Sequence, residues 1–221
     1  MSQVVAFFDL DRTLIDVNSA VLYAKYERRH GRISGWQLFT ALIYSTLYHL
    51  NLLDMEAAYS NALKHYKGVE EVSIDENTRT FFMEEVNHRL QPGAKKALEF
   101  HRSRGHKLVL LSTSSNYQAK AAAESWGLDD YIANKFPAQD GLLKGKVGKP
   151  FCYGEGKVEL AERWIEGKSV DLSKCYFYSD SYSDLPMLLR VGNPKVVNPD
   201  PKLKQYSKKV SWEIFDWAEN A

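Results

Sequence analysis

The sequence predicts an α/β protein, a doubly wound parallel sheet with a small helical domain inserted after the first strand. Short apolar segments at 4–8, 107–111 and 176–178 each lead into acidic or hydroxyl residues, as buried strands of a parallel sheet do. From residue 92 onward, strand and helix patterns alternate, which is typical of a doubly wound sheet. Residues 17–88 contain helix-compatible stretches and no convincing alternating strand pattern.

The first predicted strand ends in two acids. Val-Val-Ala-Phe-Phe is too short for a helix, and Asp9, Asp11 and Thr13 follow it at two-residue intervals. Ligands bind at the carboxyl ends of strands in open α/β sheets, so these residues form a candidate site. Two close carboxylates need a cation or a shared proton, and Mg²⁺ prefers oxygen ligands. The alternative is that the acids only terminate a strand beside a turn.

The inserted segment contains four helix candidates, at 20–29, 36–48, 54–67 and 75–90, the third starting with Asp54 as an acidic N-cap. The stretch from Trp36 to Met55 is rich in Leu, Tyr and Phe but has too many polar residues for a spanning helix. We expect it to be a helix buried against its neighbours. The alternative for this stretch is contact with a membrane surface or a lipid tail.

The second predicted strand leads into Ser112. It follows a helix that starts at Gln91-Pro-Gly and stops at Gly105. The next helix begins at Asn116, and its first amides could bind an anion. A serine at such a position is otherwise a turn or N-cap residue.

The last candidates lie after a Gly- and Lys-rich stretch at 136–151, for which we expect a short hairpin or loop beside the site. Lys157 is near the start of a predicted helix, with Lys146 and Lys149 as alternatives. The third strand is followed by Asp180 and Asp184, four residues apart.

These four motifs, in this order, resemble those of the haloacid dehalogenase superfamily. Asp9-Leu-Asp11-Arg12-Thr13 resembles motif I, and Ser112 matches motif II. Lys157 matches motif III, and the segment Ser179-Asp180 to Asp184 resembles motif IV. The resemblance extends from Val4 to the Trp212 region and is greatest to the phosphoserine-phosphatase-like branch, which has a Rossmann-like core and a helical cap. Ser179 departs from the pattern, since many members have Gly there.

The resemblance implies a Mg²⁺-dependent phosphomonoester phosphatase. Asp9 would be the nucleophile that forms an aspartyl-phosphate, and Asp11 the general acid and base. Mg²⁺ would be held by the carboxylates of Asp9 and Asp180 and the backbone carbonyl of Asp11. The phosphate would be bound by Thr13, Ser112 and Lys157, and Asp184 would orient Lys157 or a metal-bound water.

The resemblance also implies two domains. Residues 1–16 and 89–221 would form the catalytic core, and residues 17–88 the helical cap. We expect the cap to open and close during turnover, with joints near Val17 and 90–93.

The cap would select the substrate, and there the sequence is least informative. Candidates for contacting the substrate are Asp16, Asn18, Ser19 and the arginines Arg28, Arg29 and Arg32. Each is also an ordinary solvated or capping residue. Asp16 could replace the acid with which phosphoserine phosphatases bind their substrate, but no arginine matches theirs. Phosphoserine, histidinol phosphate, another amino-alcohol phosphate and a lipid head-group phosphate therefore remain as possible substrates.

Composition restricts the partners. The formal charge of +1 argues against a nucleic-acid partner. The resemblance implies a small phosphomonoester as the substrate, and we expect a monomer or homodimer. Cys152 and Cys175 are too few for a disulfide scaffold or zinc site, and no arginine-bearing phosphate loop follows either. Because the start of the chain does not resemble a secretory signal, we expect a cytoplasmic protein. The same scaffold could instead serve a phosphotransferase or a catalytically silent binding module.

Overall fold

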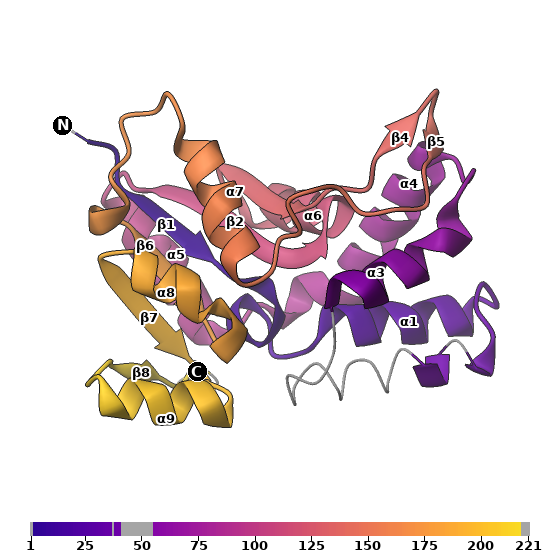
Figure 1. The fold of residues 1–221 in the computed structure, drawn as a ribbon. Coiled ribbons are helices and arrows are strands. Elements are labelled where there is room, and N and C mark those ends of the chain that lie inside the picture. The colour runs from indigo at the N-terminus through magenta and orange to yellow at the C-terminus, as the bar shows by residue number, and fades with distance from the viewer. Residues whose placement is uncertain (1, 37, 41–54, 218–221) are drawn as a thin grey trace.

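The computed structural model describes residues 2–36, 38–40 and 55–217 of the chain (Figure 1). Its centre is a six-stranded sheet in the order β3-β2-β1-β6-β7-β8, and every neighbouring pair is parallel. The strands are β1 (Val5–Phe8), β2 (Lys107–Ser115), β3 (Asp130–Asn134), β6 (Tyr176–Ser179), β7 (Asn193–Val197) and β8 (Ile214–Phe215). The predicted α/β fold class is confirmed.

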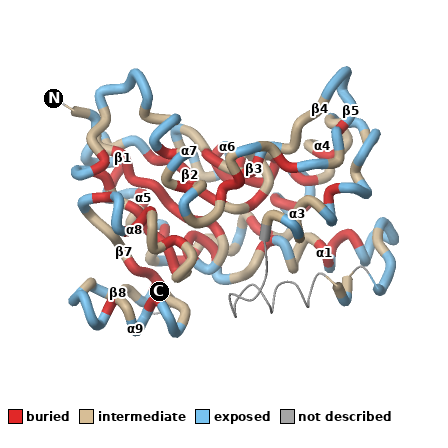
Figure 2. Tube along the Cα trace, in the orientation of Figure 1, coloured by how far each residue is buried: buried red, intermediate tan, exposed pale blue. Residues whose placement is uncertain are grey.

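Helices cover both faces of the sheet because its strands are apolar on both faces. In β1, Ala6 and Phe8 pack into the core beneath α5 (Pro92–Ser103) and α6 (Asn116–Trp126). Val5 and Phe7 pack into the core on the opposite face, beneath α7 (Glu155–Ile165), α8 (Leu185–Arg190) and α9 (Pro201–Lys209). Figure 2 shows the buried strands between more exposed helices.

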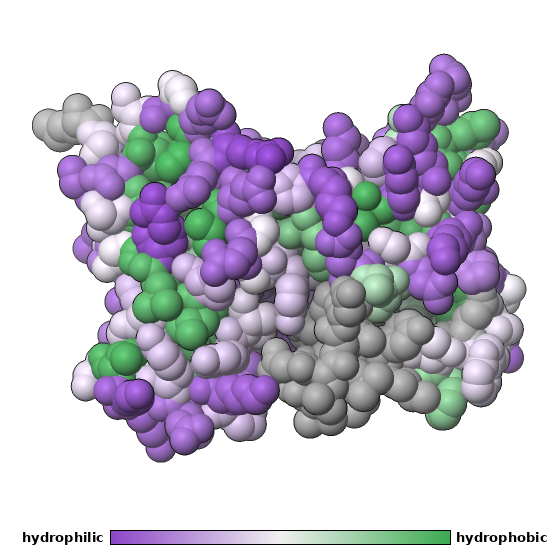
Figure 3. All heavy atoms as spheres, in the orientation of Figure 1, coloured by the Kyte–Doolittle hydropathy of each residue, from purple (hydrophilic) through white to green (hydrophobic). Residues whose placement is uncertain are grey.

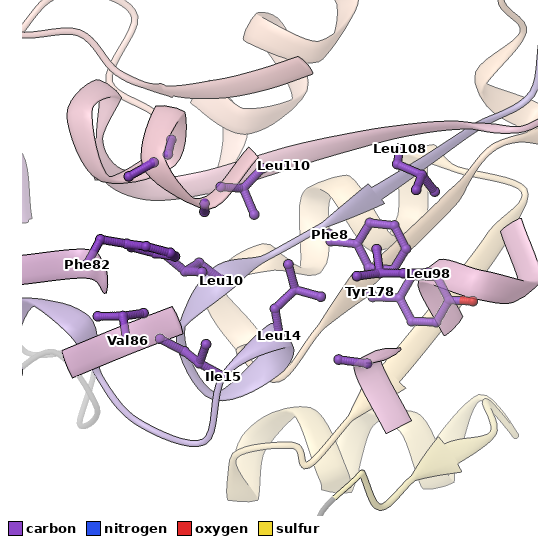
Figure 4. Close-up of a cluster of buried hydrophobic side chains, with 14 of the residues drawn as sticks. Phe8, Leu10, Leu14, Ile15, Phe82, Val86, Leu98, Leu108, Leu110 and Tyr178 are labelled. Carbon is purple, nitrogen blue, oxygen red and sulfur yellow. The ribbon is translucent and has the colours of Figure 1, made fainter. Parts of the chain in front are cut away.

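One core continues from the sheet to the inserted segment. Leu10 and Leu14 lie in the turn after β1 and pack in the same cluster as Phe82 and Val86, which come from the end of the inserted segment (Figure 4). All four side chains are fully buried. Each Å² of apolar surface buried stabilises the fold by about 25 cal/mol. Contacts with both the sheet and the inserted segment therefore hold this turn in place.

The inserted segment is helical in its described part. It contains α1 (Ser19–Arg29), α3 (Met55–Leu63) with a 3₁₀ turn at Lys64–Tyr66, and α4 (Glu71–Phe81). A π-turn (Phe82–Val86) and a 3₁₀ turn (Asn87–Arg89) follow α4. Most of the helix predicted at 36–48, and Asp54 with its N-cap, lie outside the described residues. The predicted start of the last helix at Asp75 is wrong, because the helix begins four residues earlier.

A hairpin from the core explains that earlier start. Strands β4 (Ala138–Gln139) and β5 (Leu142–Leu143) pair antiparallel, so of the hairpin or loop expected within 136–151 the structure has the hairpin. The backbone N–H of Glu71 donates to Gly141 O at 2.8 Å, and Leu143 exchanges hydrogen bonds with Gly68 and Val69, both 2.9 Å. The hairpin thus satisfies backbone groups at the start of α4.

The two connections between core and inserted segment lie side by side. Ile15 and Leu90 form an antiparallel bridge, and Gln91 N–H donates to Leu14 O at 2.9 Å. The inserted segment therefore joins the core through a paired, two-stranded connection.

No helix in the described ranges is both long and apolar enough to cross a membrane.

Trp36 and Phe39 are 74% and 51% exposed, contrary to the expectation of burial at those two positions. Figure 3 shows hydrophobic side chains in separate groups among hydrophilic ones on the visible face. The other residues of the stretch, except Leu38, Thr40 and Met55, lie outside the described ranges.

Candidate active site

Asp9 lies where β1 ends beside β6, and its backbone N–H donates to Tyr178 O at 2.9 Å. The chain then makes a wide turn over Leu10–Leu14 in which Arg12 has φ 58°, a left-handed conformation that is uncommon for a side-chain-bearing residue. The buried Gln91 amide holds this turn by donating to Thr13 O at 2.7 Å and Ile15 O at 3.2 Å. The turn is thus fixed by tertiary hydrogen bonds.

Lys157 bridges two carboxylates. Its Nζ donates to Asp9 Oδ1 and to Asp184 Oδ2, both at 2.8 Å, and its side chain is 2% exposed. Burial would lower the pKa of Lys157, but the Asp184 and Asp9 carboxylates outweigh it and raise that pKa well above its usual value. Lys157 is therefore a fixed positive charge beside Asp9.

Ser179 holds Asp184 in place. Its hydroxyl donates to Asp184 Oδ2 at 2.7 Å and accepts from the backbone N–H of Ser181 at 3.1 Å. A glycine here could make neither side-chain bond, so the departure of Ser179 from the motif adds a contact. Asp184 accepts hydrogen bonds from Ser179 and Lys157 and is almost fully buried.

Asp180 is a buried acid near other acids. Thr13 Oγ1 donates to its Oδ1 at 3.5 Å, a long contact, and Asp200 N–H donates to its backbone oxygen at 2.8 Å. Burial, and then the charges of Asp9 and Asp184, raise the pKa of Asp180 well above its ordinary value. Burial likewise raises the pKa of Asp9 to about 7, against the opposing effect of Lys157.

Asp11 joins the site to the inserted segment. Its Oδ1 accepts from the backbone N–H of Ser19 at 2.9 Å, at the start of α1. Burial raises the pKa of this carboxyl group. Asn18 caps the same helix by accepting from Val21 N–H at 3.0 Å. Asp11 is therefore positioned by the start of α1.

The site opens into a cavity of about 310 Å³ between the sheet edge and the inserted helices. Asp9, Asp11, Ser112 and Asp180 line it, coming from the ends of three neighbouring strands. Asn18 and Ser19 line it from the inserted segment. Three other predicted residues, Thr13, Lys157 and Asp184, do not line the cavity. Thr13 contacts Asp180 and Lys157 contacts Asp9, whereas Asp184 is linked to Asp9 only through Lys157.

The structure does not bring the remaining candidates to the cavity. Asp16 is 57% exposed and pairs with Arg89 at 3.6 Å. Arg32 pairs with Glu27 at 2.6 Å, and Arg29 pairs with Glu85. Arg28 is exposed, and none of these residues lines the cavity. The two lysines considered as alternatives to Lys157 are exposed as well. Lys149 pairs with Glu56, and Lys146 lies on the surface.

Sequence reasoning missed several residues of the site. The turn residue Arg12 lines the cavity, and so does Ser114, whose buried Oγ has no hydrogen-bond partner among the described residues. Tyr59 lines it from α3 and donates to Thr113 O at 2.8 Å. Asp200 accepts from the N–H groups of Tyr182 and Leu203, at 2.7 and 2.8 Å. The predicted Asp9-to-Thr13 motif contained Arg12, but nothing in the sequence marked the other three.

The charges at this site fit a divalent cation. The carboxyl groups of Asp9, Asp11, Asp180, Asp184 and Asp200 outnumber the cations Lys157 and Arg12 by three. No group of three or more His, Cys, Asp or Glu side chains in the described ranges has metal-binding geometry. A metal here would therefore need carboxylates together with a backbone carbonyl and water, which is the ligand set that Mg²⁺ accepts.

The family model for haloacid dehalogenase-like hydrolases matches residues 6–189, which include every motif described above. The chain therefore belongs to this family of hydrolases, and the predicted family and enzyme class are confirmed.

The chain is also similar to curated phosphatases and to a solved structure over nearly its whole length. A histidinol-phosphatase from Neisseria meningitidis is 26% identical over 96% of this chain and 98% of its own length. A phosphoserine phosphatase from Mycobacterium tuberculosis is 26% identical over 96% of this chain and 70% of its own. A crystal structure of a Bordetella pertussis protein of unknown function has a TM-score of 0.88 at 25% identity, covering 98% of this chain and 100% of the other.

Proposed function

We propose that this protein is a Mg²⁺-dependent phosphatase that hydrolyses small phosphomonoesters through an aspartyl-phosphate on Asp9. The observation that carries the proposal is the joint placement of Asp9, Asp11, Ser112 and Asp180 around one cavity, with Lys157 bound to Asp9. The names of the two curated relatives, both phosphatases of small phosphorylated metabolites, support this class of substrate.

Asp9 is the nucleophile in this proposal. Its Oδ1 is held by Lys157, so the carboxylate has a fixed orientation at the cavity wall. Attack on phosphorus forms the acyl phosphate and releases the alcohol, and water then cleaves the acyl phosphate. Lys157 reduces the repulsion between the anionic nucleophile and the anionic ester.

Asp11 is the general acid and base. It lies two residues from Asp9 on the same wall of the cavity, and its carboxyl group is fixed by Ser19 N–H. It protonates the leaving alkoxide and then removes a proton from the attacking water. The hydroxyls of Ser112 and Ser114 supply hydrogen-bond donors for the phosphoryl oxygens.

Asp9, Asp180 and the backbone carbonyl of Asp11 would hold the Mg²⁺, with Asp184 and Thr13 supporting them. When bound, the cation offsets negative charge on the nucleophile and the ester. Residues 17–88 would form the cap and the remaining residues, 1–16 and 89–221, the catalytic core.

Phosphate release from a panel of phosphomonoesters tests the proposal, with Mg²⁺ or with a chelator. We expect release that needs Mg²⁺ and is lost in Asp9→Asn, which replaces the nucleophile with an amide of the same shape. Asp16→Asn is the matched control, because it removes an exposed carboxylate outside the cavity. Equal release by wild type and Asp9→Asn, or release unaffected by the chelator, would overturn the proposal.

A further inference from the structure

The two ends of the cavity differ in chemistry. One end holds charged residues of the core loops, Asp9, Asp11, Arg12, Asp180 and Asp200. The other end, here called the aromatic end, is lined by Tyr23, Tyr66, Ile74, Tyr117 and Phe136. Ile74 and Tyr117 belong to one buried cluster against which Tyr66 and Phe136 pack. The aromatic end therefore forms one continuous wall.

Tyr59 lies between the two ends. Its hydroxyl donates to Thr113 O on β2, beside Ser112, while its ring packs edge-on against Phe151 at 5.3 Å. Ala58, Ala62 and Leu63, from the same helix, extend the apolar wall. A phosphate held at Asp9 would thus direct its alcohol portion along uncharged side chains, which include the polar Thr78, Ser115 and Gln118 as well as the apolar ones.

Among the described lining residues, the aromatic end contains no Lys, Arg, Asp or Glu. Arg12 lies in the turn beside Asp11 at the charged end, where its positive charge favours the ionised forms of Asp11 and Asp180. The charges behind the wall are already engaged. Glu27 is buried and paired with Arg32 at 2.6 Å, and Glu71 accepts from the hydroxyl of Tyr117 at 3.1 Å.

We propose that this cavity selects phosphomonoesters whose alcohol carries an uncharged group of about one aromatic ring or a short alkyl chain. The selection rests on the proposed function and names its substrate class. An amino-acid phosphate would bring an ammonium and a carboxylate to a wall whose described residues carry no counter-charge, and buried unpaired charges are strongly unfavourable. An apolar group gains burial there, and aromatic side chains offer ring faces and edges to a ring.

The volume of the cavity bears on the size of the alcohol group that it can enclose. Its volume of about 310 Å³ includes the space beside Asp9 that the phosphate would fill. It is at the small end of ligand pockets, which span roughly 300 to 1,000 Å³. A ring of benzene size fits the remainder.

The test compares kcat/KM for methyl phosphate, 2-phenylethyl phosphate and O-phosphoserine, all esters of primary alcohols. Methyl phosphate engages only the charged end. Phosphoserine has the better leaving group, so its slower turnover would reflect recognition. We expect kcat/KM for 2-phenylethyl phosphate to exceed that for phosphoserine by about tenfold or more. A preference for phosphoserine would overturn the selection while leaving the proposed function intact.

A charge-insertion variant gives an independent readout. Ala62→Arg places a cation on the cavity wall, and the neighbouring Asn61→Arg adds the same charge outside the lining. We expect Ala62→Arg to raise the phosphoserine to 2-phenylethyl phosphate ratio about tenfold, and Asn61→Arg to leave it unchanged. Equal ratios in both variants, with methyl phosphate still hydrolysed, would contradict the selection. No release from any ester by wild type would instead refute the proposed phosphatase.

Discussion

Asp180 is a residue whose burial works against stability. Its carboxylate is almost completely buried near Asp9 and Asp184, and its one side-chain hydrogen bond among the described residues is the long contact from Thr13. Desolvation and like charge both disfavour the ionised form. Residues arranged in this way store unfavourable energy that a bound cation would relieve.

Asp180→Asn tests this account of the site. The amide keeps the shape and the acceptor for Thr13 but removes the buried charge. Without metal, we expect the free energy of unfolding to rise by about 1 to 3 kcal/mol. Added Mg²⁺ should raise the Tm of wild type but not that of Asp180→Asn. Asp16→Asn, an exposed control, should retain the Mg²⁺ response. Denaturant and thermal unfolding measure both effects, and a destabilised Asp180→Asn would contradict the account.

His101 is a second buried titratable residue, on the face of the sheet away from Lys157. It is fully buried, with its Nδ1 2.8 Å from His106 Nδ1 and its Nε2 2.9 Å from the Tyr178 hydroxyl. Burial, followed by the charges of His106 and Arg104, lowers the pKa of His101 from 6.5 to about 4. The folded state therefore favours the neutral imidazole.

The stability of the fold should consequently fall in acid. Between pH 6.5 and about 4 the unfolded chain binds a proton that folded His101 does not, so the stabilisation present above pH 6.5 is lost as the pH falls. The shift corresponds to about 3 kcal/mol. Urea unfolding at pH 7 and pH 4.5 should show a smaller loss for His101→Gln than for wild type. Exposed His88→Gln is the control, and parallel losses in all three proteins would contradict this prediction.

Some residues of the site are placed by their neighbours in the sequence, and others by contacts with distant segments. Asp9 and Asp180 immediately follow β1 and β6, and Ser112 follows the apolar residues 108–111 within β2, so local sequence placed all three at the sheet edge. Gln91 and Tyr59 act by binding carbonyl groups of distant segments. No local pattern encodes such a partner, and the sequence therefore did not indicate that Gln91 or Tyr59 contributes to the site.

The start of α7 is the element that positions Lys157. Gly154 caps it with φ 53°, and Gly156 sits so close to the preceding loop that a Cβ would lie 1.9 Å from Phe151 O. A side chain at 156 therefore requires the helix start to move.

Gly156→Ala should lower both stability and activity. We expect a loss of about 1 to 3 kcal/mol in the free energy of unfolding, because Phe151 O is a backbone atom. We also expect a lower kcat at temperatures where the variant is fully folded, since Lys157 is the next residue and would shift from Asp9. Gly35→Ala is the control, because its added Cβ would meet no atom closer than 4.0 Å. Unchanged kcat in folded Gly156→Ala would disprove the coupling.

Element boundaries were predictable where local signals set them. The Gln91-Pro-Gly turn begins α5, and Asn116 begins α6, as expected. The start of α4 at Glu71 was not predictable. The backbone N–H of Glu71 donates to the hairpin over residues 138–143, which is about 70 residues away in the sequence.

At the scale of the whole molecule, the inserted segment contacts the core at several separate places. Tyr59 binds β2, Lys120 pairs with Asp75 at 2.7 Å, and the hairpin bonds the chain before α4. The sequence indicated the alternation of strands and helices, but not the strand order. That order places β1 between β2 and β6 and so brings Asp9, Ser112 and Asp180 together.

The central claim is that Asp9 carries the phosphoryl group and that Asp11 handles the proton. The measurement that tests it most directly is a pre-steady-state burst with p-nitrophenyl phosphate and Mg²⁺ in Asp11→Asn. This leaving group needs no proton, so the first step survives, while hydrolysis of the acyl phosphate lacks its base. We predict a burst stoichiometric with protein, slow turnover, and a phosphoryl group located on Asp9 by peptide mass spectrometry. A phosphoryl group on another residue, or turnover as fast as wild type without a burst, would contradict the account.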